Sequence, residues 1–320
     1  MRLRTVSCQD PGWVRIRHGR GFRYLDQSGA ALAPEDRDRV RALVIPPAWT
    51  DVWICPHPRG HLQAVGTDEA GRRQYLYHSA WREQRDLEKF ERVTALAAKL
   101  PGLRRKLRNR LRDGPGDAET ERVRELAAAV RLIDLGCFRP GSDASAEEFG
   151  SHGLTTLERR HVRREGGVLV FRFVGKAGIE HEVRIDDPDL LPLIDRLRRR
   201  RSRDGRLFRV TPEEVNAYVR ELTGLEVTAK DFRTWHATVT AAVSLAGAEP
   251  ASSATARRKR VVEAVAAVAD LLGNTPTVAR GSYVDPRIID LYEAGTVLDP
   301  VPSGPDAVDR AVARLLASSS

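Results

Sequence analysis

Lysine, cysteine and long apolar runs are scarce in this 320-residue chain. Only six of its 53 basic residues are lysines, and the other 47 are arginines. It has no apolar run of about 18 residues or more, the length that a membrane-spanning helix needs. The first residues, MRLRTVSCQDPGW, lack the apolar core of a secretory signal. We therefore expect a cytoplasmic protein with no membrane partner.

The few cysteines and the scattered histidines argue against a metal site. Cys8, Cys55 and Cys137 are an odd number without C-x-x-C spacing, which disfavours both a disulfide framework and a thiolate zinc site. We expect all three to be buried free thiols. His57 and His61 have the best spacing for a ligand pair, but the Pro and Gly in HPRGH prevent the helical face that such a pair needs.

The usual signatures of several enzyme classes are also missing. The chain has no GxxxxGK[ST] loop, no GxGxxG after a strand, no HExxH helix and no GxSxG elbow. Nucleotide hydrolysis, hydride transfer and zinc or serine hydrolysis therefore lose their support, and we expect no nucleotide and no cofactor. The net charge of +9 suits a polyanionic partner such as nucleic acid. A compositional drift towards arginine explains that charge equally well, so charge alone leaves both interpretations open.

The pattern of apolar residues divides the chain into two domains. Residues 1–80 read as short strands broken by Gly and Pro, with one helix near 34–43, and they carry 12 arginines against 8 acidic residues. From Ser79 onwards the spacing becomes helical, and Leu103, Leu107 and Leu111 form one stripe. We predict domains at 1–80 and 81–320, in an α+β fold with a β-rich first domain and a mainly helical second one.

One small sheet interrupts the helical domain. The segments VLVFRFV and IEHEVRI alternate with period two around GKAG, which predicts a hairpin with Lys176 at its tip. The other expected elements are helices, at 118–134, over LLPLIDRLRRRR, after the capping box Thr211 to Glu214, over KDFRTWHATVTAAVSLA, up to Leu272, and near 307–317.

Phosphate chemistry without a metal needs a nucleophile, fixed cations and an acid for the leaving oxygen. Arg139 follows a helix end in CFRPG, and Arg233 lies in the first turn of the helix that begins at KDFR. Each arginine taken alone reads as an ordinary surface cation. Lys176 is harder to dismiss, because lysine is rare here and a glycine-flanked turn suits a proton donor.

Six segments, in order between about residues 44 and 296, resemble one known family. They are GRRQYLYHSAWREQRDLEKFERV, CFRPG, GLTTLERRHV, FVGKAGIEHEV, KDFRTWHATV and GNTPTVARGSYVDP. The chain resembles the type IB DNA topoisomerases of the poxvirus and bacterial branch, which belong to the DNA breaking-rejoining enzymes with a tyrosine nucleophile. The resemblance implies a monomeric clamp around supercoiled double-stranded DNA in the nucleoid. It also implies relaxation of positive and negative supercoils, without ATP or metal, through a 3′-phosphotyrosyl intermediate, strand swivelling and religation.

The resemblance also implies roles for individual residues. Tyr283 in GSYVDP takes the place of the nucleophile, Arg139 and Arg233 those of the transition-state arginines, and Lys176 that of the general acid. Where the family often has histidine, nine residues before the tyrosine, this chain has Asn274, as bacterial members do. An amide donates a hydrogen bond but does not titrate, so Asn274 fits a stabilising role and excludes proton transfer.

DNA contacts are expected from a second group of residues. The resemblance points to Arg72, Arg73, Gln74, Tyr75 and Tyr77 of GRRQYLYH, and to Lys230 of K-x-x-R. Tyr75 and Tyr77, two apart on a strand, fit packing on one face of the sheet equally well. The arginine-rich stretches 104–112 and 198–201 are expected to attract phosphates. The rival functions are a tyrosine recombinase, which usually has H-x-x-R and a helical leading domain, and a noncatalytic DNA-binding protein with the same fold.

Overall fold

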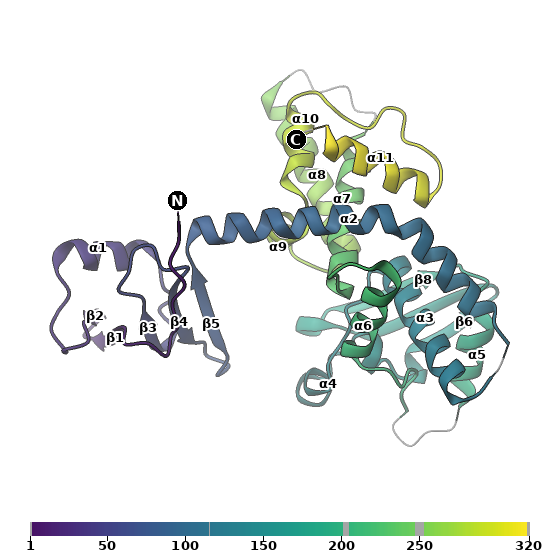
Figure 1. Cartoon of the computed structure of the whole chain (residues 1–320), viewed down its shortest axis with the longest axis horizontal. Coiled ribbons are helices and arrows are strands. Elements are labelled where there is room, and N and C mark those ends of the chain that lie inside the picture. The colour runs from purple at the N-terminus through teal and green to yellow at the C-terminus, as the bar shows by residue number, and fades with distance from the viewer. Residues whose placement is uncertain (1, 115, 201–204, 247–252, 319–320) are drawn as a thin grey trace. The chain divides into compact units, whose positions relative to one another are not determined.

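The computed structural model of the chain describes residues 2–114, 116–200, 205–246 and 253–318 (Figure 1). The chain forms two compact units, Met1–Lys89 and Phe90–Ser320. The division lies inside the long helix α2 (Ser79–Arg112), so this helix belongs to both units. The domain boundary near residue 80 stays a prediction.

The first unit is an antiparallel sheet with one helix. Its strands are paired in the order β2-β1-β3-β4-β5. The elements are β1 (Trp13–His18), β2 (Gly21–Leu25), α1 (Pro34–Ala42), β3 (Thr50–Ile54), β4 (Leu62–Thr67) and β5 (Arg73–Tyr77). Their apolar side chains form a small core around Trp13, Val40 and Ile54. The buried Arg15 guanidinium donates hydrogen bonds to the carbonyls of Ile45, Pro46 and Trp49, which fixes the segment between α1 and β3.

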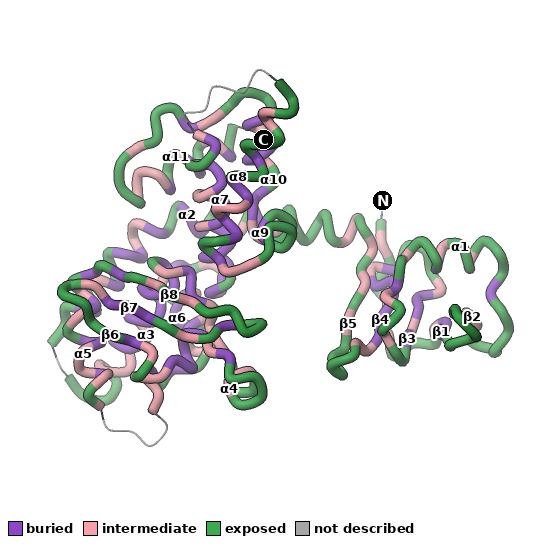
Figure 2. The backbone as a smooth tube through the Cα atoms, turned by 180° about the vertical axis from the view of Figure 1, so that it is seen from behind, coloured by how far each residue is buried: buried purple, intermediate pink, exposed green. Residues whose placement is uncertain are grey.

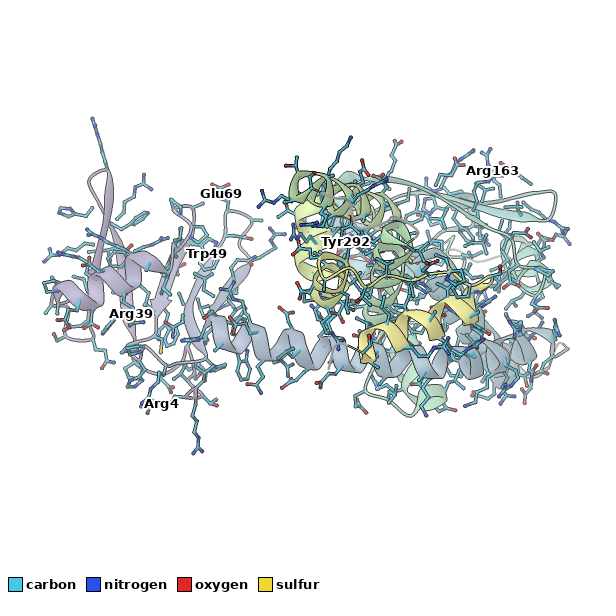
Figure 3. The ribbon with its side chains drawn as sticks, turned by 90° about the horizontal axis from the view of Figure 1, so that it is seen from above. Arg4, Arg39, Trp49, Glu69, Arg163 and Tyr292 are labelled. Atoms are coloured by element: carbon cyan, nitrogen blue, oxygen red, sulfur yellow. The ribbon has the colours of Figure 1, made fainter. Side chains whose placement is uncertain are left out.

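The second unit is mainly helical, and its buried positions concentrate in the helices and in the middle strand of its sheet (Figure 2). After α2 its helices are α3 (Ala118–Gly136), α4 (Asp143–Phe149), α5 (Leu191–Arg199), α6 (Pro212–Thr223), α7 (Ala229–Leu245), α8 (Ala254–Leu272), α9 (Pro276–Ser282), α10 (Pro286–Glu293) and α11 (Pro305–Ala317). Tyr292 of α10 lies buried among these helices, whereas Arg163 projects from the sheet (Figure 3). Leu103, Leu107 and Leu111 are buried as one stripe of α2, as the sequence predicts.

The sheet of this unit has three antiparallel strands, one more than the predicted hairpin. They are β6 (Val162–Glu165), β7 (Val168–Val174) and β8 (Glu180–Ile185), paired in that order. Because Phe173 pairs with His181 and Phe171 with Val183, these four side chains share one face. The β7–β8 connection contains a short 3₁₀ turn, Lys176–Gly178, which confirms the predicted place of Lys176.

A buried ion network joins four helices of the second unit. Arg104 of α2 binds Asp134 of α3 at 2.9 Å and Asp309 of α11 at 2.6 Å. Asp309 also accepts from the Trp235 indole of α7 at 2.7 Å. Arg104 is therefore not available to phosphates, and the expected role of 104–112 in phosphate attraction is wrong for this residue because Arg104 balances buried carboxylates. Arg201, in the second predicted stretch, lies outside the described residues.

Other predictions had mixed outcomes. The capping box forms, since the Thr211 hydroxyl accepts from Glu214 N–H and the Glu214 carboxylate accepts from Thr211 N–H. Helices α4, α9 and α10 and strand β6 were not predicted. Cys8 is only half-buried, so the expectation of three buried thiols is wrong for it, because Cys8 lies in the exposed amino-terminal segment. Within the described ranges no single helix is long and apolar enough to span a membrane, although α8 and α9, bent by 94°, pass that test as a pair.

Candidate active site

Arg139 is placed by the way in which α3 ends. Cys137 adopts a left-handed conformation (φ 52°) and donates its N–H to the Ile133 carbonyl. A left-handed non-glycine residue costs on the order of 1 kcal/mol. Packing of the next residue offsets this strain, because Phe138 is buried against the sheet residues Phe171 and Phe173. The chain thus turns out of the core, and Arg139 emerges half-buried at the surface of the unit.

Arg233 is buried and ties two helix ends together. From the second turn of α7, its guanidinium donates to the Cys137 carbonyl and, at 2.9 Å, to the Leu272 carbonyl. These are orphan carbonyls at the ends of α3 and α8, where positive charge is favourable. Its Nε is also buried, but it has no hydrogen-bond partner within the described residues. Arg233 therefore has one buried N–H group, at Nε, that could donate to a ligand.

Asn274 follows the end of α8. Gly273 adopts a left-handed conformation (φ 58°), and Asn274 N–H donates to the Ala269 carbonyl. This combination is the Schellman motif, a common way for a helix to end. The Asn274 side-chain oxygen accepts a hydrogen bond from Arg139. A guanidinium only donates, so this contact fixes the orientation of the amide. The Nδ2 group is consequently a buried donor, and it has no partner in the described part of the chain.

Tyr283 lies between α9 and α10 and packs against the core. The buried Thr238 hydroxyl of α7 accepts the Asp285 N–H at 3.2 Å and lies 3.4 Å from the Tyr283 carbonyl oxygen. Asp285 in turn caps α10 through the N–H of Arg287. The backbone on both sides of Tyr283 is thus held by α7, the helix that carries Arg233.

The phenol of Tyr283 lies in a cationic environment. The Arg233 guanidinium carbon is 5.5 Å from its ring centroid. Burial alone would raise the pKa of Tyr283, but the charge and hydrogen bond of Arg233 and the charges of Lys230 and Arg139 outweigh it. The pKa of Tyr283 is therefore held below its ordinary value. A phenol with a lowered pKa beside two arginines is suited to act as a nucleophile.

The structure brings together four of the five predicted catalytic residues. Arg139, Arg233, Asn274 and Tyr283 are linked by the contacts above, although the chain separates Arg139 from Asn274 by 135 positions. Lys176 is exposed on its turn and, among the described residues, makes no hydrogen bond or ion pair. Lys230 is also exposed, and its charge reaches Tyr283.

Two residues that belong to this site left no signal in the sequence. Thr238 positions the backbone next to Tyr283 through its buried hydroxyl, but one threonine in a helix does not stand out in the sequence pattern. His181 of β8 lines a cavity of about 30 Å³ together with Arg139 and Arg233. Burial, and then the charges of Arg139 and Arg233, lower the pKa of His181. Its pairing with Phe173 puts His181 on the face of the sheet that carries Phe171, and the cavity results from the packing of α3 and α8, which no spacing along the chain shows.

The predicted DNA-contacting residues of the first unit lie on strand β5 and the turn before it. Tyr75 and Tyr77 are exposed (46% and 37%), and their rings stack at 6.2 Å. They face solvent, whereas Leu76 packs on the core, so the alternative that the two tyrosines fill the sheet interior is wrong. Gln74 donates to Asp68 at 2.9 Å, and Arg72 binds the same carboxylate. Arg73 is exposed and lies 3.6 Å from the Cys8 sulfur.

One cluster has the composition of a metal site. The side chains of His152, Glu158 and His161 lie within 4.8 Å of one another. Arg160, however, binds the Glu158 carboxylate at 2.8 Å, and His161 Nδ1 accepts the Glu158 N–H, so its neutral form carries the proton on Nε2. The Glu158 carboxylate is thus paired with Arg160, and Nδ1 of His161 already accepts a hydrogen bond. The three side chains are held by contacts within the protein.

Comparison with known proteins identifies the family. Residues 78–290 match the family model described as the catalytic core of eukaryotic DNA topoisomerase I. The chain belongs to the type IB DNA topoisomerase family. Residues 21–68 match the amino-terminal domain of bacterial DNA topoisomerase IB, which agrees with the sheet of the first unit. The matched core includes all five predicted catalytic residues.

The chain is similar to DNA topoisomerases of several viruses. The chain is 29% identical to DNA topoisomerase 1B of Acanthamoeba polyphaga mimivirus over 285 residues, 84% of each protein. It is 22% identical to DNA topoisomerase 1B of vaccinia virus (strain Copenhagen) over 241 residues, 74% of each. A solved XerH site-specific recombinase bound to palindromic difH substrate matches with a TM-score of 0.37 and 16% identity. That match covers 60% of this chain and 49% of the recombinase, and a likeness of this size supports no conclusion.

Proposed function

We propose that this type IB topoisomerase relaxes positively and negatively supercoiled DNA by cleaving and rejoining one strand through Tyr283. The observation that carries the proposal is the meeting of Tyr283, whose pKa is lowered, with two arginines and with the Asn274 Nδ2 donor, which has no partner among the described residues. A nucleophile beside two fixed guanidinium groups, with two buried donors that have no partner among the described residues, Arg233 Nε and Asn274 Nδ2, is an arrangement ready for a phosphate. The match to the topoisomerase core supports the same activity.

The proposed cleavage step exchanges one phosphate ester for another. The Tyr283 oxygen, its proton lost to solvent, attacks a backbone phosphorus, and the bond to the 5′ oxygen breaks. Lys176 donates a proton to that leaving oxygen, which becomes a free 5′-hydroxyl. Arg139, Arg233 and Asn274 donate to the nonbridging oxygens as negative charge builds up on them. Religation is the reverse of this step.

Neither ATP nor a metal ion is required by this scheme. The 3′-phosphotyrosyl bond keeps the energy of the phosphodiester that was broken, so rejoining needs no external energy source. The guanidinium groups supply the positive charge that a metal would otherwise bring. Supercoil strain then drives strand swivelling in whichever direction lowers it, so both signs are relaxed.

DNA contact is proposed for both units. In the first unit the exposed, stacked Tyr75 and Tyr77 offer an amphipathic surface, flanked by Arg72 and Arg73. Arginines and lysines that are not engaged in buried pairs add sequence-independent attraction to phosphates, which makes binding strongly dependent on salt. We further propose that the protein acts as a monomer in the nucleoid of the cytoplasm.

Plasmid relaxation tests the proposal directly. Negatively and positively supercoiled plasmids are incubated with the protein in EDTA and without ATP, and the topoisomers are resolved on a gel. We expect both to be relaxed, and a covalent protein–DNA adduct to be trapped in denaturant. The Tyr283→Phe variant should do neither. Failure of the wild type to relax plasmid, or relaxation by Tyr283→Phe, contradicts the proposal.

Two further measurements separate the rivals. A recombinase would exchange strands between two identical DNA sites, which we do not expect here. A noncatalytic binding protein would shift DNA on a gel but leave no adduct in denaturant. Sedimentation at several protein concentrations checks the proposed monomer. The Arg139→Ala variant should relax plasmid more slowly than the wild type, which checks that activity depends on the site.

A further inference from the structure

His181 occupies the junction between the Lys176 turn and the rest of the site. It lies near the start of β8, five positions after Lys176, and its half-buried ring stacks on Phe173 with centroids 5.1 Å apart. Phe173 in turn stacks on Phe138 at 5.7 Å, the residue before Arg139. A column of three rings therefore connects the hairpin to the segment that carries Arg139.

Two glycines leave room for this ring. A Cβ atom on Gly175 would lie 2.6 Å from His181 Cδ2, and one on Gly273 would lie 2.4 Å from Cε1. Gly175 directly precedes Lys176, and Gly273 directly precedes Asn274. The backbone of Gly175 (φ −97°) suits any residue, so the ring itself excludes a side chain there. The imidazole thus fills the space between the base of the Lys176 turn and the end of α8.

The surroundings explain why an imidazole is tolerated at this place. Burial and the neighbouring arginines lower the pKa of His181, so the ring is neutral near pH 7 and adds no repulsion. Arg139 and Arg233 line the same small cavity. A lysine or arginine here would place a third cation against them, whereas a small aliphatic side chain would leave the space between the two glycines empty.

We infer that His181 is a positioning residue, which fixes the base of the Lys176 turn against the Asn274 corner so that Lys176 reaches the leaving oxygen. This rests on the proposed function, in which Lys176 is the proton donor. Because Gly175 is held, only the exposed turn and the lysine side chain need to move when DNA binds. Fewer freely rotating bonds have to be ordered in the transition state, which favours proton transfer.

A change of leaving group tests this inference. A substrate with sulfur in place of the bridging 5′ oxygen releases a thiolate. Because thiols have a pKa of about 8.5, a thiolate leaves without being protonated, whereas an alkoxide needs a proton. We expect His181→Ala to slow single-turnover cleavage of ordinary DNA at least tenfold and cleavage of the sulfur substrate less than threefold. Lys176→Ala should show the same pattern more strongly. An equal loss on both substrates, or no loss on ordinary DNA, overturns the role of His181.

Two controls distinguish positioning from general damage. Val183→Ala shortens the next side chain on the same face of β8 and should affect both substrates alike. Gly175→Ala should slow cleavage of ordinary DNA in the wild type but much less in His181→Ala, because the clash is then gone. Additive effects of these two substitutions also overturn the inference. The thermal midpoint of each variant identifies any that is unfolded at the assay temperature.

The outcomes also separate this inference from the proposed function. If the wild type cleaves neither substrate, the proposed function fails and the role of His181 fails with it. If Lys176→Ala is not rescued by sulfur, the assignment of Lys176 as the acid is wrong. If Lys176→Ala is rescued and His181→Ala is not, only the inference about His181 is wrong.

Discussion

Replacing Asn274 by aspartate removes one hydrogen-bond donor from the site and adds one negative charge, with little change in shape. The side chain keeps its shape, and its oxygen still accepts from Arg139. The lost group is Nδ2, the buried donor without a partner among the described residues. The aspartate stays ionised near neutral pH, because the adjacent Arg139 favours the charged form. The substitution therefore tests whether that donor stabilises the transition state.

The expected magnitude follows from the lost donor and from the added charge. Loss of one fixed donor to a developing oxyanion costs about 2.7–4 kcal/mol, or about 10²–10³ in rate. A carboxylate at about 4 Å from a charged oxygen adds about 4 kcal/mol of repulsion at an effective dielectric constant of about 20. Arg139 offsets most of this repulsion because it remains paired with the carboxylate. We therefore expect cleavage to slow by at least about 10².

Single-turnover cleavage of a short duplex, followed as covalent adduct in denaturant, measures this effect. Thermal unfolding should differ little from the wild type, since the Arg139 contact is kept. Asn274→His restores a donor and should retain far more activity than the aspartate variant. A cleavage rate for Asn274→Asp within about fivefold of the wild type would show that Nδ2 does not face the reacting phosphate, since the loss of such a donor costs far more.

Three further predictions concern position, ionisation and stability. Thr238→Val leaves a buried N–H unpaired, so urea unfolding should show a loss of about 1–3 kcal/mol together with slower cleavage. Because nearby cations lower the pKa of Tyr283, the cleavage rate should rise with pH and level off below the pH expected for a free tyrosine. Lys230→Gln should move that rise to higher pH in rate–pH profiles. Arg104→Met removes the cation that pairs with the buried Asp309 carboxylate and one of the two arginines bound to Asp134, so chemical unfolding should show a loss of about 3–5 kcal/mol, and DNA affinity of the folded protein should be unchanged.

Local patterns predicted the elements that carry the site. The capping box at Thr211 and the stripe Leu103, Leu107 and Leu111 depend only on spacing along the chain, and both are confirmed. The hairpin around Lys176 was predicted from period-two alternation and flanking glycines. Short helices were missed, because α4, α9 and α10 have too few turns to show an apolar period.

Burial could not be read from the same patterns. Arg104 sits in a run of basic residues that looks like a solvated helix face, yet it is buried and pairs with three carboxylates on α3 and α11. Tyr75 and Tyr77 fitted either face of β5, and only the position of the core under Leu76 decided between them. Alternation shows that residues share a face, but not which face meets the core.

The sequence by itself determined the fold class and the longer helices and, through its resemblance to a family, pointed to the tyrosine, the arginines and Asn274 as candidate site residues. Tertiary structure decided what each side chain is free to do. Arg233 donates to carbonyls 96 and 39 positions away, and Arg139 fixes the Asn274 amide so that its nitrogen has no partner within the described ranges. His181 fits between glycines that lie on opposite sides of it in sequence. Such contacts join segments far apart in the chain, and they leave no period or spacing in the sequence because only packing brings the partners together.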